Sequence, residues 1–169
     1  MDYQIKPLQS SDDLSPVLNI YKSNNEYFQI VSQEDASMDA ILKDMTEVPP
    51  NTSTDQKCFC LITENGNPIG VIDYIENYPD QDVLYIGLFL VDGKKHNRGI
   101  GSEIYKYIER IAMDEGYERI RLGVVQENIK GLRFWQEMGF ITVKTVKSSI
   151  KPETNWTIHV MEKRLSVSK

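Results

Sequence analysis

The chain has 169 residues, a length typical of one domain or of two very small ones. Hydrophobic residues make up 40% of the sequence and charged residues 26%, which is ordinary for a soluble globular protein. Twenty-five acidic residues against 19 basic ones give a formal net charge of −6. This balance argues against a nucleic-acid partner and against a polybasic membrane-surface protein, and it favours cationic partners.

Targeting signals and metal-binding patterns are not expected. No stretch approaches the roughly 20 apolar residues of a membrane span, and the first residues lack the basic and apolar regions of a signal peptide. Cys58 and Cys60 would share one face of a strand, where such neighbours rarely form a disulfide. The two histidines are far apart in the sequence. We therefore expect a cytoplasmic protein without a membrane partner, a disulfide or a metal site.

The first 50 residues predict one short strand, Tyr3–Pro7, and two helices. Ser15 followed by Pro16 is typical of a helix start, with the serine as the cap. Ser32, three residues before Asp35, predicts the cap of a second helix with an apolar stripe at positions 38–45. The polar and aromatic residues 24–28 between them are expected to form a loop.

The rest of the chain predicts a hairpin, a buried strand and alternating elements. The hairpin surrounds an Asn65-Gly66 turn, and the strand is apolar enough to be buried on both faces. The expected strands are Cys58–Thr63, Ile69–Ile75, Val83–Val91, Arg119–Val125, Phe140–Val146 and Trp156–Lys163, with helices at Gly99–Glu115 and Asn128–Met138. This order predicts a single domain over residues 1–169, of the mixed α/β (α+β) class with one central, partly antiparallel sheet.

A basic, glycine-containing loop lies between the buried strand and the following helix. Lys94, Lys95, His96 and Arg98 concentrate positive charge there. A helix N-terminus offers unpaired N–H groups and the positive end of the helix dipole, and glycine lets the backbone approach a phosphate closely. The loop therefore predicts a phosphorylated ligand. It lacks the Gly-Lys-Ser/Thr ending of a P-loop, and Ile104 occupies a position where the dinucleotide fingerprint needs glycine.

Three motifs resemble the GNAT superfamily of N-acetyltransferases: His96–Gly101, Leu122–Asn128 and Phe134–Phe140. They cover about a third of the chain, and the expected order of elements matches the family over nearly all of it. The resemblance implies a mostly antiparallel central sheet with helices on both faces. It also implies that the strand pair holding the cofactor splays apart.

The resemblance further implies acetyl-CoA as the donor and assigns residues to its binding. The pyrophosphate loop, acting mainly through backbone N–H groups, would be Asn97, Arg98, Gly99, Ile100, Gly101 and Ser102. The backbone of Phe89 and Val91 would bind the pantetheine arm, and an N–H near Val91 would polarise the thioester carbonyl. Asn128 would contact the pantetheine.

Two positions depart from the family pattern. His96 occupies the place of the usual Gln or Arg that opens the loop; it either donates to phosphate or is a solvated loop residue. Trp135 stands where the family often has a tyrosine that protonates the leaving thiolate. Tryptophan carries only an N–H donor, so Trp135 is expected to form the cofactor wall or core. Thiolate departure is then assisted by another residue or unassisted.

The general base is not fixed by the sequence. The buried strand carries no carboxylate where many family members have one, and Gly87 occupies that position. Tyr85, which shares a face with Gly87, and Asp73 on the neighbouring strand are the catalytic candidates. Each also has an ordinary structural interpretation, Tyr85 as a packing residue on the sheet and Asp73 as a solvent-facing or turn carboxylate.

Taken together, we expect an acetyl-CoA-dependent N-acetyltransferase that acts by direct attack in a ternary complex. The expected acceptor is a primary amine of a small molecule, cationic in view of the net charge. A peptide or protein acceptor is the alternative within the enzyme class, and an acetyl-CoA-binding regulatory module or a nucleotide binder is the alternative outside it. The resemblance is compatible with a homodimer.

Overall fold

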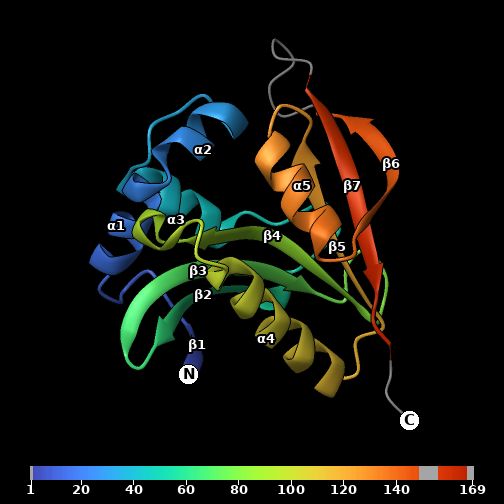
Figure 1. Cartoon of the computed structure of the whole chain (residues 1–169), viewed down its shortest axis with the longest axis horizontal. Helices are drawn as coiled ribbons and strands as arrows, with labels where there is room; N and C mark the ends of the chain where they lie inside the picture. Colours follow the sequence, from blue (N-terminus) through green and yellow to red (C-terminus); the bar gives the residue numbers. More distant parts are fainter. Residues whose placement is uncertain (1, 149–155, 167–169) are drawn as a thin grey trace.

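The computed structural model describes residues 2–148 and 156–166. Within them, seven strands form one sheet in the order β1-β2-β3-β4-β5-β7-β6 (Figure 1). Only β4 and β5 are parallel neighbours, and the other neighbouring pairs are antiparallel. The strands are β1 Tyr3–Pro7, β2 Lys57–Glu64, β3 Asn67–Glu76, β4 Val83–Val91, β5 Arg119–Val125, β6 Ile141–Lys147 and β7 Thr157–Arg164.

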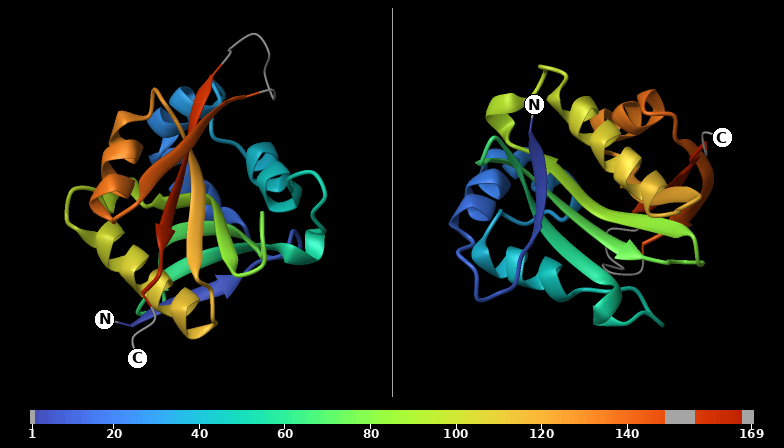
Figure 2. Two further views of the ribbon diagram at one scale, coloured as in Figure 1. Left: turned by 90° about the vertical axis from the view of Figure 1, so that its right-hand side faces the viewer. Right: turned by 90° about the horizontal axis from the view of Figure 1, so that it is seen from below.

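Helices cover both faces of this sheet (Figure 2). They are α1 Ser15–Ser23, α2 Asn25–Val31, α3 Met38–Thr46, α4 Ile100–Asp114 and α5 Ile129–Glu137, and two short 3₁₀ turns are η1 Thr54–Gln56 and η2 Gly93–Lys95. Among the described residues, none of the helices has the length and apolar character needed to cross a bilayer. The mixed α/β class predicted from the order of elements is confirmed.

Two hydrophobic clusters lie on opposite faces of the sheet. One contains α4 and α5 side chains such as Ile104 and Trp135, and the other contains α1 and α3 side chains such as Val17 and Ile41. Strand β3 contributes to both clusters through successive residues. The alternation of side chains along a strand therefore links the two halves of the core through one shared sheet.

Both predicted serine caps were wrong. Leu14 is the N-cap of α1, and the Ser15 N–H instead donates to Asp13 Oδ1 at 3.0 Å. The Ser32 hydroxyl donates to the Phe28 carbonyl at 2.8 Å and follows the end of α2. The cap of α3 is Ser37, whose extended backbone lets its side chain accept from the Ala40 N–H. Several serines lie near the start of each of these helices, and the local sequence pattern does not indicate which residue is the cap.

The loop expected at residues 24–28 is also wrong, because residues 25–31 form α2. The ring of Phe28 stacks on Tyr21 of α1 at 4.8 Å and is buried in the α1–α3 cluster. A seven-residue helix is too short to be stable alone, so this tertiary contact accounts for its formation. The strands and the last two helices begin and end within two residues of the predicted positions.

Candidate active site

The sheet opens between β4 and β5. Their pairing runs only from Val83 opposite Arg119 to Ile86 opposite Leu122. The next residues along the two strands are Gly87 and Gly123. The divergence confirms the splayed strand pair expected from the resemblance, and a glycine stands on each strand where the separation begins.

A β-bulge at Gly87 marks the same point on the other side of β4. In the pairing with β3, Asp73 is opposite Leu88 and Tyr74 is opposite Ile86, so Gly87 is the extra residue. Bulges bend a strand and change the direction of its side chains. Here the bend turns β4 away from β5 beyond Gly87.

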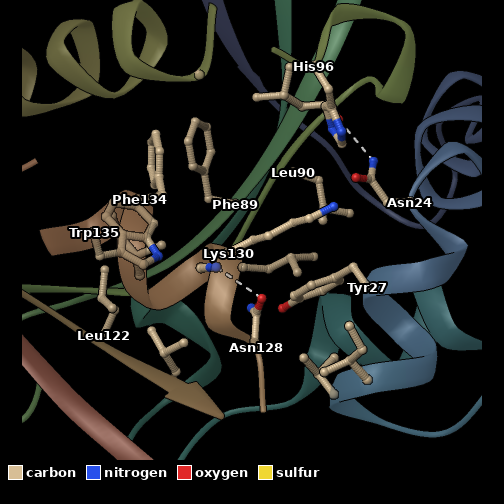
Figure 3. A pocket seen from close by; sticks show the side chains of 18 of the residues that line it. Asn24, Tyr27, Phe89, Leu90, His96, Leu122, Asn128, Lys130, Phe134 and Trp135 are labelled. Atoms are coloured by element: carbon tan, nitrogen blue, oxygen red, sulfur yellow. Dashed lines mark hydrogen bonds between the residues drawn. The ribbon is translucent and has the colours of Figure 1, made fainter. Parts of the chain in front are cut away.

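A cavity of about 600 Å³ occupies the opening (Figure 3). Its walls are the diverging parts of β4 and β5, the end of α1 together with α2, the loop before α4, and α5. Of the residues predicted to bind cofactor, all but the exposed Arg98 line it: Phe89, Val91, His96, Asn97, Gly99, Ile100, Gly101, Ser102, Asn128 and Trp135. The structure therefore brings together residues that are up to 46 positions apart in the chain.

Asp73 lies immediately behind the bulge and is only 4% exposed. Its Oδ2 accepts a 2.7 Å hydrogen bond from Lys57 Nζ, whereas Oδ1 has no hydrogen-bond partner within the described residues. A Cβ at Gly87 would stand 3.3 Å from this Oδ1. Burial raises the pKa of Asp73 to about 6, because loss of hydration outweighs the attraction of Lys57.

Tyr85 lies behind the second glycine. A Cβ at Gly123 would stand 3.3 Å from the Tyr85 hydroxyl, and the Tyr85 ring packs edge-on against Tyr78 at 5.3 Å. Burial raises the pKa of Tyr85, so its hydroxyl stays protonated at neutral pH. Neither Tyr85 nor Asp73 is itself a cavity-lining residue, but each is adjacent to a glycine that is.

The loop before α4 has the backbone expected of an anion site. Asn97 and Gly99 both adopt left-handed conformations, with φ of 63° and 74°. Gly99 is the N-cap of α4 and offers no side chain to the first turn. The N–H groups of that turn, which have no acceptor within the helix, belong to cavity-lining residues. Lys95 also lines the cavity next to them.

His96 is turned toward β4. Its Nε2 donates to the Val91 carbonyl at 2.8 Å, and Asn24 Nδ2 donates to the same oxygen at 2.9 Å. Asn24 follows α1 and is 7% exposed. The end of β4, the basic loop and the end of α1 are thus held together at one carbonyl. Because His96 makes this contact through Nε2, its Nδ1 remains available to a ligand.

Asn128 and Trp135 have clear structural partners. Asn128 caps α5, because its Oδ1 accepts from the Gly131 N–H at 3.0 Å. Trp135 is buried in an aromatic cluster, with ring centroids 5.9 Å from Phe89 and 5.3 Å from Tyr105. These contacts fit the wall role expected for Trp135, and for Asn128 they leave the amide nitrogen available to a ligand.

Two cavity residues were missed by the sequence reasoning. Figure 3 shows the Tyr27 hydroxyl of α2 pointing into the cavity and the Lys130 side chain extending across it from α5. Residues 24–28 were expected to form a loop, and that assignment left the direction of the Tyr27 side chain open. Lys130 carried no signal, because a lysine on a helix surface is ordinary.

The chain was compared with known families and proteins. A model of the acetyltransferase (GNAT) family matches residues 17–140, which is more than half of the chain. The "uncharacterized protein YdhI" of Bacillus subtilis (strain 168) is 27% identical over 82 residues, a match that covers 48% of each chain. The chain therefore spans about half the length of this curated relative in the match.

Solved structures resemble the whole chain. An acetyltransferase from Thermus thermophilus superimposes with a TM-score of 0.72 at 21% identity and covers 98% of both chains. The ribosomal-protein-S18-alanine N-acetyltransferase from Escherichia coli gives a TM-score of 0.67 at 14% identity, covering 99% of this chain and 97% of that one. At these identities the likeness concerns the fold.

Proposed function

The chain belongs to the GNAT family of acetyltransferases, and on this basis we propose that it transfers the acetyl group of acetyl-CoA to a primary amine. The observation that carries the proposal is the opening between β4 and β5, with a basic helix N-terminus at one end and a buried carboxylate at the other. The acceptor attacks the thioester directly in a ternary complex. Both cysteines of the chain, Cys58 and Cys60, lie on β2 away from the cavity.

The donor's diphosphate is assigned to the loop before α4. The free N–H groups of the first turn, the helix dipole and Lys95 all favour an anion there. The pantetheine arm then follows β4 into the opening. Val91 has its carbonyl turned away from β3 and toward His96, so by alternation the N–H groups of Phe89 and Val91 face the opening.

We assign the thioester to the bulge at Gly87, and not to the neighbourhood of Val91. Val91 lies four positions after Gly87 along the strand, a distance of about 13 Å. The amine nitrogen that attacks the thioester carbonyl must lie within hydrogen-bond reach of the group that takes its proton. The buried carboxylate candidate is adjacent to Gly87, so the thioester belongs at the same end of the opening.

Asp73 is the proposed base. The acceptor ammonium first loses one proton to solvent, because only the neutral amine has a lone pair. Its nitrogen then attacks the carbonyl carbon, the N–C bond forms, and the C–S bond breaks as CoA leaves as a thiolate. The proton lost by the nitrogen passes to the unpaired Oδ1 of Asp73. A pKa of about 6 suits this task, since the group is ionised at neutral pH and still accepts a proton.

Tyr85 is the proposed hydrogen-bond donor. Its raised pKa keeps the phenol protonated, so it can stabilise the negative charge that develops on oxygen or sulfur during transfer. A free thiol has a pKa near 8.5. The thiolate can therefore leave without the acidic tyrosine that Trp135 replaces, and solvent returns its proton.

The proposed acceptor is a small cationic amine. The net charge of −6 and Glu26 on the α2 wall of the cavity favour a positively charged molecule. The unpaired oxygen of Asp73 can accept a hydrogen bond from its ammonium. The Escherichia coli neighbour is described as acting on a protein alanine, so a peptide N-terminus is the competing acceptor. Another solved neighbour is described as a putative phosphinothricin N-acetyltransferase.

The test is thiol release from acetyl-CoA across a panel of amines, with a blank that lacks the protein. The panel contains polyamines, aminoglycosides, free amino acids and short peptides with different N-termini. Release that depends on a small cationic amine supports the proposal, and release with peptides alone replaces the acceptor. Tight binding of CoA by calorimetry without release from any amine would instead support a regulatory acetyl-CoA-binding module.

A further inference from the structure

Lys57 is a buried lysine at the start of β2. Its side chain is 7% exposed. The ammonium donates to two acceptors, Oδ2 of Asp73 at 2.7 Å and the carbonyl oxygen of Glu47, just after α3, at 2.8 Å. The lysine therefore connects the end of α3 to the carboxylate behind the bulge.

Stability alone is a weak reason for such a pair. Removing two charges from water costs free energy that their attraction only partly offsets, and well-packed apolar residues often serve equally well. The pair also leaves Asp73 Oδ1 without a partner in the described part of the chain. An unpaired buried oxygen costs further free energy, so the arrangement calls for a functional explanation.

We infer that Lys57 is a positioning residue for the proposed base: it holds Oδ2 of Asp73 so that Oδ1 stays unpaired and next to Gly87, which lines the cavity. This inference rests on the proposed function. The bond to the Glu47 carbonyl fixes the ammonium, and the ammonium in turn fixes the rotation of the carboxylate. Without Lys57 the carboxylate is free to rotate and its negative charge has lost its counterion.

The other charged groups near Asp73 oppose its ionisation. From the α3 side Asp44 and Glu47 contribute negative charge. Asp44 is itself paired, since it accepts a 2.7 Å hydrogen bond from the Tyr21 hydroxyl. Further titratable neighbours of Asp73 are Tyr21 of α1, Tyr27 of α2, and Cys58 and Cys60 of β2. Lys57 is thus the cation that keeps Asp73 ionised near neutral pH.

The first test does not depend on the acceptor. The carboxyl ¹³C signal of Asp73, assigned by its loss in Asp73→Asn, is titrated in the full-length wild type and in Lys57→Met. We expect the midpoint to rise by about one pH unit or more in the variant. Lys57→Arg, which keeps a cation, should stay closer to the wild type. A midpoint in Lys57→Met within about 0.3 pH units of the wild type overturns the inference.

The second test is kinetic. With an amine identified by the thiol-release panel, we expect Lys57→Met to lower kcat at pH 7 by about 10-fold or more, with partial recovery at higher pH. The KM for acetyl-CoA should change little, because Lys57 lies outside the donor loop. An unchanged kcat and pH profile in Lys57→Met, beside a strongly impaired Asp73→Asn, overturns the role of Lys57 and leaves the proposed function intact.

Two controls make these outcomes readable. Lys163→Met removes a lysine that pairs with Glu109 at 2.5 Å on the α4 face, away from the cavity, and should change neither the Asp73 titration nor the pH profile. Circular dichroism checks the fold, and Lys57→Gln replaces Lys57→Met if that variant does not fold. If Asp73→Asn retains wild-type transfer, the base assignment in the proposed function fails, whatever the titration of Asp73 shows.

Discussion

At the scale of single residues, the arrangement around Asp73 depends on the lack of a side chain at Gly87. The carboxylate comes from β3, one strand away from the position where the family pattern led us to look. A Cβ at Gly87 would press against Asp73 Oδ1 at 3.3 Å. Glycine at the bulge therefore leaves room for the carboxylate beside the cavity. Strand β4 has no carboxylate at this position, and Asp73 of the neighbouring strand β3 lies there in its place.

Asp73→Asn should lower kcat/KM for the amine by about 100-fold or more, because asparagine cannot accept the proton. In the wild type, kcat/KM should fall more steeply below pH about 6 than protonation of the amine alone requires, because Asp73 becomes protonated there and loses its basicity. The pH dependence of kcat/KM from thiol release measures both. A wild-type profile whose slope does not steepen between pH 7 and pH 5 would contradict the assignment.

Tyr85→Phe removes the hydroxyl next to Gly123 and keeps the ring against Tyr78. We expect kcat to fall by about 10-fold or more through loss of one hydrogen bond to developing charge. The dissociation constant of acetyl-CoA should stay within about twofold. Steady-state kinetics with calorimetry separates the two quantities, and an unchanged kcat would remove Tyr85 from the mechanism.

At the scale of elements, α4 combines two tasks. Its buried stripe, including Ile104 and Ile108, anchors it to the sheet, and its first turn presents N–H groups to the cavity. Gly99 and Gly116 lie at its two ends, both with positive φ and both with open space where a Cβ would stand. The same backbone strain therefore accompanies a side chain at either end, and only one end faces the proposed diphosphate.

This symmetry provides a matched pair of variants. Gly99→Glu should weaken CoA binding by about 100-fold or more, because a carboxylate would stand where the diphosphate is expected. Gly116→Glu should lose a similar stability, about 1 kcal/mol, and bind CoA as the wild type does. Calorimetric titration with CoA and thermal unfolding provide the two measurements. Equal CoA affinity of both variants would refute the loop assignment.

At the scale of the whole molecule, one sheet separates two clusters of buried side chains. Ile41 of α3 is fully buried on one face and Ile104 of α4 on the other. Because β3 contributes successive residues to both, neither cluster can lose its packing while the other keeps it. We therefore expect residues 1–169 to unfold as one domain.

The expected outcome is a single denaturation transition, with coincident curves from far-ultraviolet circular dichroism and tryptophan fluorescence. Ile41→Ala and Ile104→Ala should each lower the free energy of unfolding by about 2–5 kcal/mol, and each should move the whole transition. Saturating CoA should raise the midpoint in both variants. Two separable transitions, with each variant moving only one of them, would show independent units.

The sequence by itself determined the strands, the last two helices and the basic, glycine-containing loop before α4. Those features depend on local periodicity, on glycine positions and on an unbroken apolar run such as Val83–Val91, which few other structures accommodate. It also contained the family motifs. Local pattern was insufficient for the helix starts, where Ser15 and Ser32 were chosen and Leu14 and Ser37 are the caps.

Only the tertiary structure decided α2, the position of Asp73 and the burial of Lys57 beside it. The α2 helix depends on the contact between Phe28 and Tyr21, and no periodicity over seven residues predicts it. Asp73 and Gly87 are brought together by strand pairing and a bulge. Register across strands depends on how whole faces are buried, so the sequence supplied the candidate residues and their packing selected the site.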